Sequence, residues 1–471
     1  MEHGTDTFQN PQVAVAGASG FIGQALGQSL ARRFHPVALS RSERQPGSGY
    51  LECRRADLFS LRGATEALAG ADYAVYLVHS MMPSARLVQG NFSDLDILCA
   101  DNFGRAAAAN GVRRIIYVGG LVPDGVELSD HLESRLEVES ALGCAGVPVT
   151  TLRAGMVVGA KGSSYQLLAR LVRRLPVMAC PRWTQTRMQP VSLREVVASI
   201  EELIDEDGTE TQCFDLGTDE SLSYLQLMRT VANSLGLRRH FVPVPFLSPR
   251  LSRLWVCLTT GAPAALVSPL VESLEHEMVV RPGFHFRPQE SHRRSVEEML
   301  QEALLDEADL SDTPRAFRKS SSSPTEDSKV SSVQRLHPPR GSDARWLAST
   351  YTAWLSTIMR GLIQIDSVQS TGEVRFMLGS TNHKLLGLQP LKERSQADRQ
   401  VFRVTSGLLA RTTERGRLEF RQVLGGTAAI AALQDFVPRL PWWLYRLTQG
   451  TFHGWVMNRF RTHVAIGAPC D

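Results

Sequence analysis

Three glycines at a fixed spacing near the N-terminus constrain the fold of this chain more than any other feature. Gly17, Gly20 and Gly23 lie in the run Val-Ala-Val-Ala-Gly-Ala-Ser-Gly-Phe-Ile-Gly at residues 13–23. An apolar segment before them predicts a buried strand, and the pattern after them predicts a helix that ends near Arg33. Glycines permit a tight turn, close approach of a ligand to the main chain and close helix–strand packing. The segment therefore predicts a cradle for a dinucleotide pyrophosphate, because N–H groups at a helix N-terminus attract phosphate.

The spacing Gly-x-x-Gly-x-x-Gly, with Ala18-Ser19 and Phe21-Ile22 between the glycines, resembles the turn of extended and atypical short-chain dehydrogenase/reductases. The resemblance extends over roughly the first 300 residues. It implies an α/β fold, a Rossmann-type doubly wound parallel sheet with a small substrate lobe. It also implies cofactor contacts from Gly17, Ser19, Gly20, Phe21, Ile22 and Gly23.

The end of the second apolar run bears on the choice of cofactor. This run, residues 36–40, ends in Ser40-Arg41-Ser42 without an acidic residue. An acidic side chain there binds the ribose 2′-hydroxyl of NAD, whereas an arginine accommodates the 2′-phosphate of NADP. Ser40 and Arg41 therefore favour NADP(H) over NAD(H), although surface arginines are also common without such a role. The remaining cofactor-binding residues that the resemblance implies are Asp57 and Leu58 beside the adenine, and Val78, His79 and Ser80 after a buried strand.

The chain departs from the family at the positions that carry the chemistry. His131 and Arg135 replace the family's Tyr-x-x-x-Lys, and Gly119-Gly120-Leu121 replaces the usual serine or threonine. Three interpretations remain open. His131 could donate a proton, since imidazole titrates near neutral pH, while Arg135 binds the ribose. The protein could instead bind nucleotide without catalysis, or His131 could be an ordinary polar residue at a helix start.

We therefore expect an NADP(H)-binding oxidoreductase that acts on a carbonyl, quinone-like or other apolar small molecule. The alternative is a non-catalytic NAD(P)-binding sensor or assembly protein, similar to the nucleotide-binding accessory subunit of respiratory complex I. Hydride transfer to an added acceptor would separate the two. Met156, Met178, Trp183 and Met188 suggest an apolar pocket, although such side chains are more often ordinary core.

Composition argues against several other classes. The 471 residues are 43% hydrophobic with a net charge of +3, enough for two or three domains with sizeable cores. Without zinc spacing or a basic tract with interleaved aromatics, neither a metal nor a nucleic acid is expected. Seven scattered cysteines without CxxC and a polar segment 1–12 favour a cytoplasmic protein with reduced thiols. Pro263 and Pro269 interrupt the apolar run 254–270, so we expect no transmembrane segment.

The chain is expected to divide into three parts. Residues 1–309 should form the NAD(P)-binding domain with its substrate lobe, and 310–344 a flexible linker, because its serines, prolines and charges bury little apolar surface. Residues 345–471 predict a separate α+β domain, with a helix over 346–363, alternating strands, and helix from 428 to 464.

This last part resembles a bacterial domain of unknown function appended to chains of this type. Its element order suggests a helix-grip cup for an apolar ligand. The aromatic residues and arginines of 436–446 could also contact a membrane surface peripherally, although such aromatic stripes are more often core.

Overall fold

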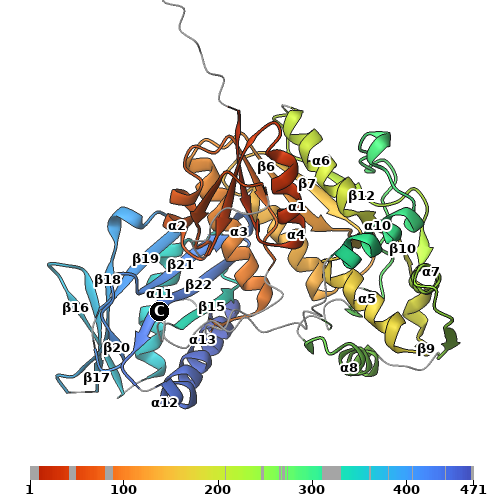
Figure 1. Cartoon of the computed structure of the whole chain (residues 1–471). Coiled ribbons are helices and arrows are strands. Elements are labelled where there is room, and N and C mark those ends of the chain that lie inside the picture. The colour runs from red at the N-terminus through yellow and green to blue at the C-terminus, as the bar shows by residue number, and fades with distance from the viewer. Residues whose placement is uncertain are drawn as a thin grey trace, which may run out of the picture. The chain divides into compact units, whose positions relative to one another are not determined.

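The chain forms two compact units in a computed structural model (Figure 1). The first comprises Met1–Met82 and Cys99–Lys319, and the second comprises Pro83–Leu98 and Ser320–Asp471. The structure describes residues 10–41, 49–79, 88–206, 208–244, 249–264, 267, 271–272, 274–309, 330–359, 362–379, 381–405, 407–440 and 442–467.

A parallel sheet of seven strands forms the centre of the first unit, in the order β12-β7-β6-β4-β1-β2-β3. The order reverses between β1 and β4, which creates the switch point where open α/β sheets bind ligands. Central strands are apolar throughout because helices cover both faces of the sheet. The strands are β1 (Gln12–Ala16), β2 (His35–Ser40), β3 (Glu52–Arg55), β4 (Tyr73–Tyr76), β6 (Arg114–Gly120), β7 (Val149–Ala154) and β12 (Gln212–Leu216).

Helices pack on this sheet through apolar faces. One core joins β1 to α1 and α6, with Val15, Leu26 and Ile200 fully buried in it. A capping box at Ser192 starts α6, in which the Glu195 side chain returns to the Ser192 backbone N–H at 2.9 Å. The helices are α1 (Phe21–Leu30), α2 (Leu61–Ala67), α3 (Phe92–Ala109), α4 (Asp130–Leu142) and α6 (Leu193–Asp205).

A smaller lobe completes the first unit and has a core of its own. Met178 and Met188 are each 1% exposed in that core, so these two residues are ordinary packing. A buried ion pair holds the returning chain against β12, because Arg281 Nη2 lies 2.7 Å from Asp215 Oδ1. The lobe contains α5 (Ser163–Arg174), α7 (Tyr224–Ser234), α8 (Pro249–Thr260), α10 (Val296–Asp309), β8 (Val157–Val158), β9 (Val177–Cys180), β10 (Arg187–Met188), β11 (Val191–Ser192), β13 (Leu222–Ser223) and β14 (His240–Pro243).

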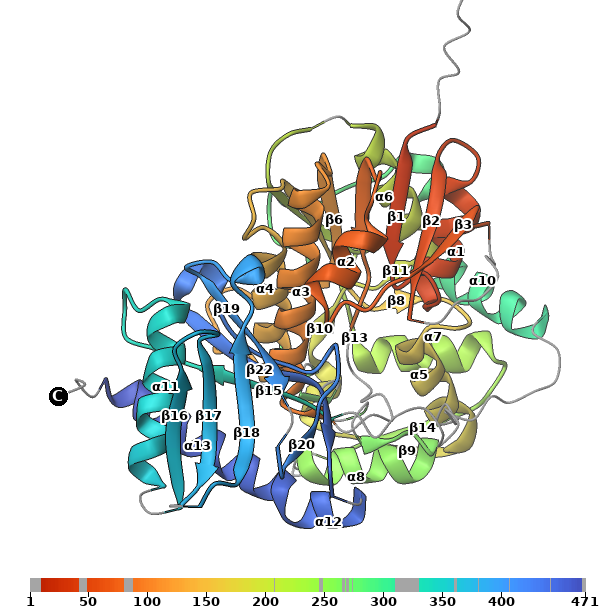
Figure 2. The ribbon, with the colours of Figure 1, turned by 90° about the vertical axis from the view of Figure 1, so that its left-hand side faces the viewer.

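The second unit is an α+β domain built on one mostly antiparallel sheet. Its strand order is β16-β17-β18-β19-β21-β22-β15-β5, with β20 also paired to β22. Figure 2 shows α11 and α13 behind strands β16 to β18, and Tyr351 of α11 contacts Phe460 of α13 at 5.0 Å between ring centroids. The elements are β5 (Val88–Gln89), β15 (Val330–Leu336), α11 (Ala344–Ile358), β16 (Ile363–Val368), β17 (Glu373–Leu378), β18 (Lys384–Pro390), β19 (Arg399–Thr405), β20 (Ala410–Arg411), β21 (Arg417–Val423), β22 (Ala428–Pro438), α12 (Trp442–Leu447) and α13 (Gln449–Ile466).

Two elements of this unit differ from the sequence-based expectation. Residues 428–438 were expected to be helical, but they form the strand β22. Their alanines favour a helix locally, yet β22 pairs with β21 on one side and β15 on the other, and this pairing overrides the local preference. Residues 330–336, within the expected linker, form β15 and bury Val330, Val333 and Leu336 completely.

A segment from the N-terminal half of the chain completes this second sheet. Strand β5 pairs in parallel with β15, and Gln89 Nε2 donates a hydrogen bond to the Gly450 carbonyl at 3.2 Å. The buried Asp94, in the first turn of α3, accepts a hydrogen bond from Arg335 Nε at 2.8 Å. The second unit is therefore discontinuous in sequence, which no motif had indicated. No helix in the described parts of the chain is both long and apolar enough to cross a membrane.

Candidate functional site

The glycine turn joins β1 to α1 as expected, and its geometry excludes side chains. Gly17 has a φ of +91°, a conformation that side chains other than glycine rarely adopt. The Gly20 N–H donates to the Gly17 carbonyl at 2.9 Å and closes the turn. A Cβ atom at Gly23 would lie 2.4 Å from the Gly17 carbonyl oxygen and 2.7 Å from the Cα of Ala18. The turn therefore keeps its shape only with glycine at the third position.

The N-terminus of α1 is suited to a phosphate. Gly20 is its N-cap and supplies no side-chain hydrogen bond, so the first-turn N–H groups can receive an anion. Lys161 Nζ lies 3.4 Å from Oε1 of Gln24, a residue in the second turn of this helix. Lys161 could not be predicted from the sequence, because a lysine so far along the chain from the glycine turn has no local pattern that marks it. The loop at Gly159 packs closely on the ring of Phe21. A Cβ atom at Gly159 would lie 2.6 Å from that ring, so this contact requires glycine.

The other predicted cofactor residues follow neighbouring strands. Because β4, β1 and β2 are adjacent and parallel, their carboxyl ends lie at one edge of the sheet. Val78 and His79 follow β4, the glycine turn follows β1, and Ser40 is the last residue of β2, directly before Arg41. Arg41 is exposed, and Ser40 and Val78 are partly buried.

The remaining predicted cofactor-binding residues are Asp57, Leu58 and Ser80. Asp57 is exposed, and its Oδ1 accepts the N–H of Phe59 at 3.2 Å. Leu58 is partly buried, and Asn102 Nδ2 donates to its carbonyl at 2.8 Å. Ser80 lies outside the described residues.

The start of α4 places the two candidate catalytic residues one turn apart. Ser129 caps this helix by accepting the N–H of Leu132 at 3.4 Å. His131 lies in the first turn and is partly buried, whereas Arg135 is only 7% exposed. The hydroxyl of the buried Tyr117 on β6 donates a hydrogen bond to the Arg135 carbonyl at 3.5 Å and so links α4 to the sheet.

The structure brings His131 together with His79. Their ring centroids lie 5.3 Å apart at an interplanar angle of 41°. His79 was predicted from the sequence as a cofactor-binding residue and His131 as a catalytic residue, but their contact was not predicted. A neutral imidazole has one donor and one acceptor nitrogen, and its charge changes near neutral pH. Two neighbouring imidazoles can therefore donate hydrogen bonds to a bound molecule or accept them from it.

An ion pair fixes α4 against the sheet. Arg153 on β7 donates to the carboxylate of Glu139 on α4, through Nε to Oε2 at 3.2 Å and through Nη2 to Oε1 at 3.3 Å. These side chains are 12% and 24% exposed. Two parallel hydrogen bonds constrain both position and orientation, so the pair holds the helix that carries His131 in place.

No group of three or more His, Cys, Asp or Glu side chains in the described part of the chain is arranged to hold a metal ion.

Comparisons with known proteins agree with the nucleotide cradle. Residues 17–170 match a family model described as NAD(P)H-binding. The auxiliary protein GraX of Staphylococcus aureus (strain NCTC 8325 / PS 47) is 31% identical over 143 residues, which are 30% of this chain and 43% of that protein. The chain thus matches less than half of the length of this curated relative.

Solved structures resemble the first unit. Triphenylmethane reductase of Citrobacter sp. is 18% identical with a TM-score of 0.50, and the match covers 62% of this chain and 99% of that one. An NADPH-dependent quinone oxidoreductase of Escherichia coli is 19% identical with a TM-score of 0.47 and the same coverage. The first of these likenesses shows a shared fold.

Proposed function

We propose that the protein is an NADP(H)-dependent oxidoreductase acting on a carbonyl, quinone-like or other apolar small molecule, because residues 17–170 match an NAD(P)H-binding family model. The contact between His79 and His131 at the sheet edge supports this proposal most directly. It supplies proton donors at the place where the family's tyrosine is absent.

Each part of the site has a role in this proposal. The glycine turn and the N-terminus of α1 bind the pyrophosphate, with Lys161 close enough to add a positive charge. Arg41 binds the 2′-phosphate, and Arg135 binds the ribose next to the nicotinamide. NADPH, when bound, supplies a hydride to the substrate carbon. His131 donates the proton that the carbonyl oxygen needs to become a hydroxyl, and solvent returns a proton to the imidazole.

The surroundings of this proton donor fit an apolar substrate. Strand β6 ends at Gly119 and Gly120, which carry no hydroxyl group, and the next residue, Leu121, is fully buried. A Cβ on Gly119 would lie 3.1 Å from the Tyr117 ring, so a serine or threonine is disfavoured there. In this proposal the two imidazoles polarise the carbonyl in place of such a hydroxyl.

Substitution of His131 tests the proposal. With NADPH and a panel of quinones and aromatic ketones, His131→Phe should lower kcat by about 10²–10⁴-fold, the range for loss of a general acid, and leave the Kd for NADPH nearly unchanged. Arg135→Ala should weaken NADPH binding and turnover together. His240→Phe, at an exposed histidine of β14, is the matched control and should change neither.

One outcome would favour the alternative function. If the wild-type protein binds NADPH but reduces no acceptor, and His131→Phe and Arg135→Ala bind it as the wild type does, the oxidoreductase proposal fails. The replacement of Tyr-x-x-x-Lys would then mark a nucleotide-binding sensor or assembly protein.

A further inference from the structure

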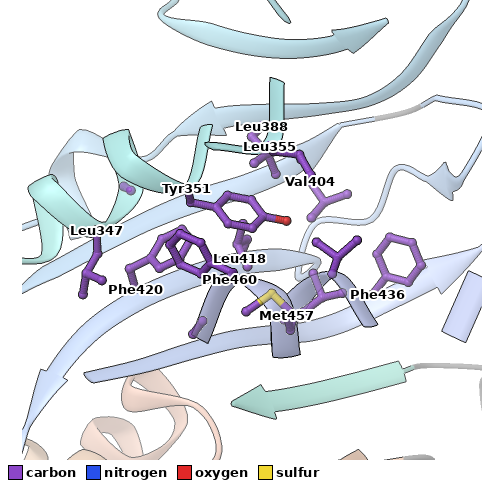
Figure 3. Close-up of a cluster of buried hydrophobic side chains, with 14 of the residues drawn as sticks. Leu347, Tyr351, Leu355, Leu388, Val404, Leu418, Phe420, Phe436, Met457 and Phe460 are labelled. Atoms are coloured by element: carbon purple, nitrogen blue, oxygen red, sulfur yellow. The ribbon is translucent and has the colours of Figure 1, made fainter. Parts of the chain in front are cut away.

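The second unit contains an apolar cavity that the nucleotide site does not explain. Its volume is about 120 Å³, and it lies between one face of the sheet and the helices α11, α12 and α13. Four of its lining residues are labelled among the buried side chains of Figure 3: Leu355 from α11, Leu388 and Leu418 from the sheet, and Phe436 from β22. Well-packed protein interiors contain few voids larger than a water molecule, so a cavity of this size calls for an explanation.

Two polar side chains enter this lining from one helix. Gln449 and His453 are four residues apart on α13 and therefore share a face. Gln449 Nε2 donates to the Leu409 carbonyl at 3.2 Å, which identifies the other end of the amide as the acceptor. That oxygen, Oε1, is buried and has no hydrogen-bond partner among the described residues. A buried acceptor without a partner is costly, so a ligand that donates to it gains affinity.

The lining carries no charge at neutral pH. Burial lowers the pKa of His453 to about 4, so its imidazole is neutral there. The other lining side chains are aliphatic, aromatic or amide groups. A charged ligand would lose its hydration in this cavity without gaining a counter-ion, which excludes carboxylates and amines as favoured occupants.

The volume limits the size of the occupant. An engineered apolar cavity of about 150 Å³ accommodates one benzene molecule and stays free of water. We propose that the cavity in the second unit binds a neutral molecule with a single aromatic ring and one hydroxyl group, a simple phenol. The ring packs among the leucine and phenylalanine side chains, and the hydroxyl donates a hydrogen bond to one of the two polar acceptors of the lining, the His453 imidazole or Gln449 Oε1.

An exposed aromatic pair marks the side from which such a molecule can enter. Phe452 belongs to the lining and is 43% exposed. It stacks on Trp455 of the same helix at 5.9 Å between ring centroids, and Trp455 is 44% exposed. Ring faces open to solvent can receive an aromatic ligand before it reaches the interior.

The full-length protein, without added nucleotide, allows a test that does not depend on the proposed oxidoreductase activity. Binding of 4-fluorophenol and of fluorobenzene is measured by ¹⁹F NMR titration. We expect one saturable site for each probe, with 4-fluorophenol bound about fivefold more tightly because only it forms the hydrogen bond. His453→Leu should remove most of this fivefold preference while fluorobenzene still binds.

Two further variants complete the design. His383→Leu replaces an exposed histidine outside the lining and should keep the preference for 4-fluorophenol. Leu386→Trp, within the lining, should fill the cavity and abolish binding of both probes. Absence of saturable binding by the wild type would overturn the proposal, as would an unchanged preference in His453→Leu. Because His453→Leu compares two probes on the same protein, the test holds even if Leu386→Trp fails to fold.

Discussion

Replacement of Gly23 by alanine separates the phosphate-binding role of the glycine turn from simple packing. The added methyl group would meet the Gly17 carbonyl oxygen at 2.4 Å and two backbone atoms of Ala18 at 2.7 and 2.9 Å. None of these atoms belongs to a flexible side chain, so the turn must move away from α1. We expect weaker binding of NADPH, because the turn and the first-turn N–H groups then no longer face the pyrophosphate together.

The size of the effect follows from two opposing contributions to stability. Overpacking costs about 1–3 kcal/mol, while alanine in place of glycine within a helix returns about 1 kcal/mol. The net loss of folding stability should therefore be small, about 0–2 kcal/mol. Loss of a single hydrogen bond to a charged phosphate costs about 1.5–3 kcal/mol, so the Kd for NADPH should rise about ten- to a hundredfold.

A second glycine provides the matched control. A Cβ at Gly104, inside α3, would lie 2.4 Å from the Leu142 carbonyl oxygen, a clash of the same size outside the glycine turn. Gly104→Ala should lower the Tm without weakening NADPH binding comparably. Calorimetric titration and thermal unfolding of both variants measure the two effects. Wild-type affinity in Gly23→Ala, or equal losses of affinity in both variants, would refute the phosphate-binding role.

Two further predictions address cofactor choice and pH. Arg41→Asp should reverse or erase a preference for NADPH that is about ten- to a hundredfold in the wild type, and equal dissociation constants for NADPH and NADH in the wild type would contradict the role of Arg41. Burial alone would raise the pKa of Glu419 in the second unit, but the guanidinium groups of Arg421 and Arg399 outweigh it and lower that pKa to about 2. An unfolded glutamate titrates near 4.3, so the ionised form contributes up to about 3 kcal/mol of stability, present above about pH 4.5 and lost as the pH falls toward 2. Chemical unfolding of wild type and Glu419→Gln should thus differ most above about pH 4.5 and converge as the pH falls toward 2, and a difference independent of pH would refute the assignment.

The sequence was informative where function imposes a local pattern. The glycine turn could be predicted because each glycine meets a local requirement of backbone conformation or of space. The place of the carboxyl ends of β1, β2 and β4 then followed from the fold that such a turn implies. His131 and Arg135 were found through their place in a family-like helix. The contact between His131 and His79 was not predictable, because it depends on how a helix start and a strand end meet in space.

Other features could not be predicted, because the residues that determine them are far apart in the sequence or have a misleading local preference. The alanines of β22 favour a helix locally, and only its partners β21 and β15 make it a strand. The two residues of β5 are too few to show any periodicity. The ion pair between Glu139 and Arg153 joins a helix to a strand, and only the three-dimensional structure shows that these two residues meet.

The parallel pairing of β5 with β15 limits how this polypeptide can be divided. A fragment that begins at residue 320 would carry β15 without β5, leaving hydrogen-bonding groups along one side of β15 unpaired. It would also leave Arg335 without the Asp94 carboxylate and the Gly450 carbonyl without the Gln89 amide. Open strand edges recruit other chains, so such a fragment is prone to self-association. The two units are therefore not separate stretches of sequence, because the second sheet is completed by β5, which lies in the chain between the two segments of the first unit.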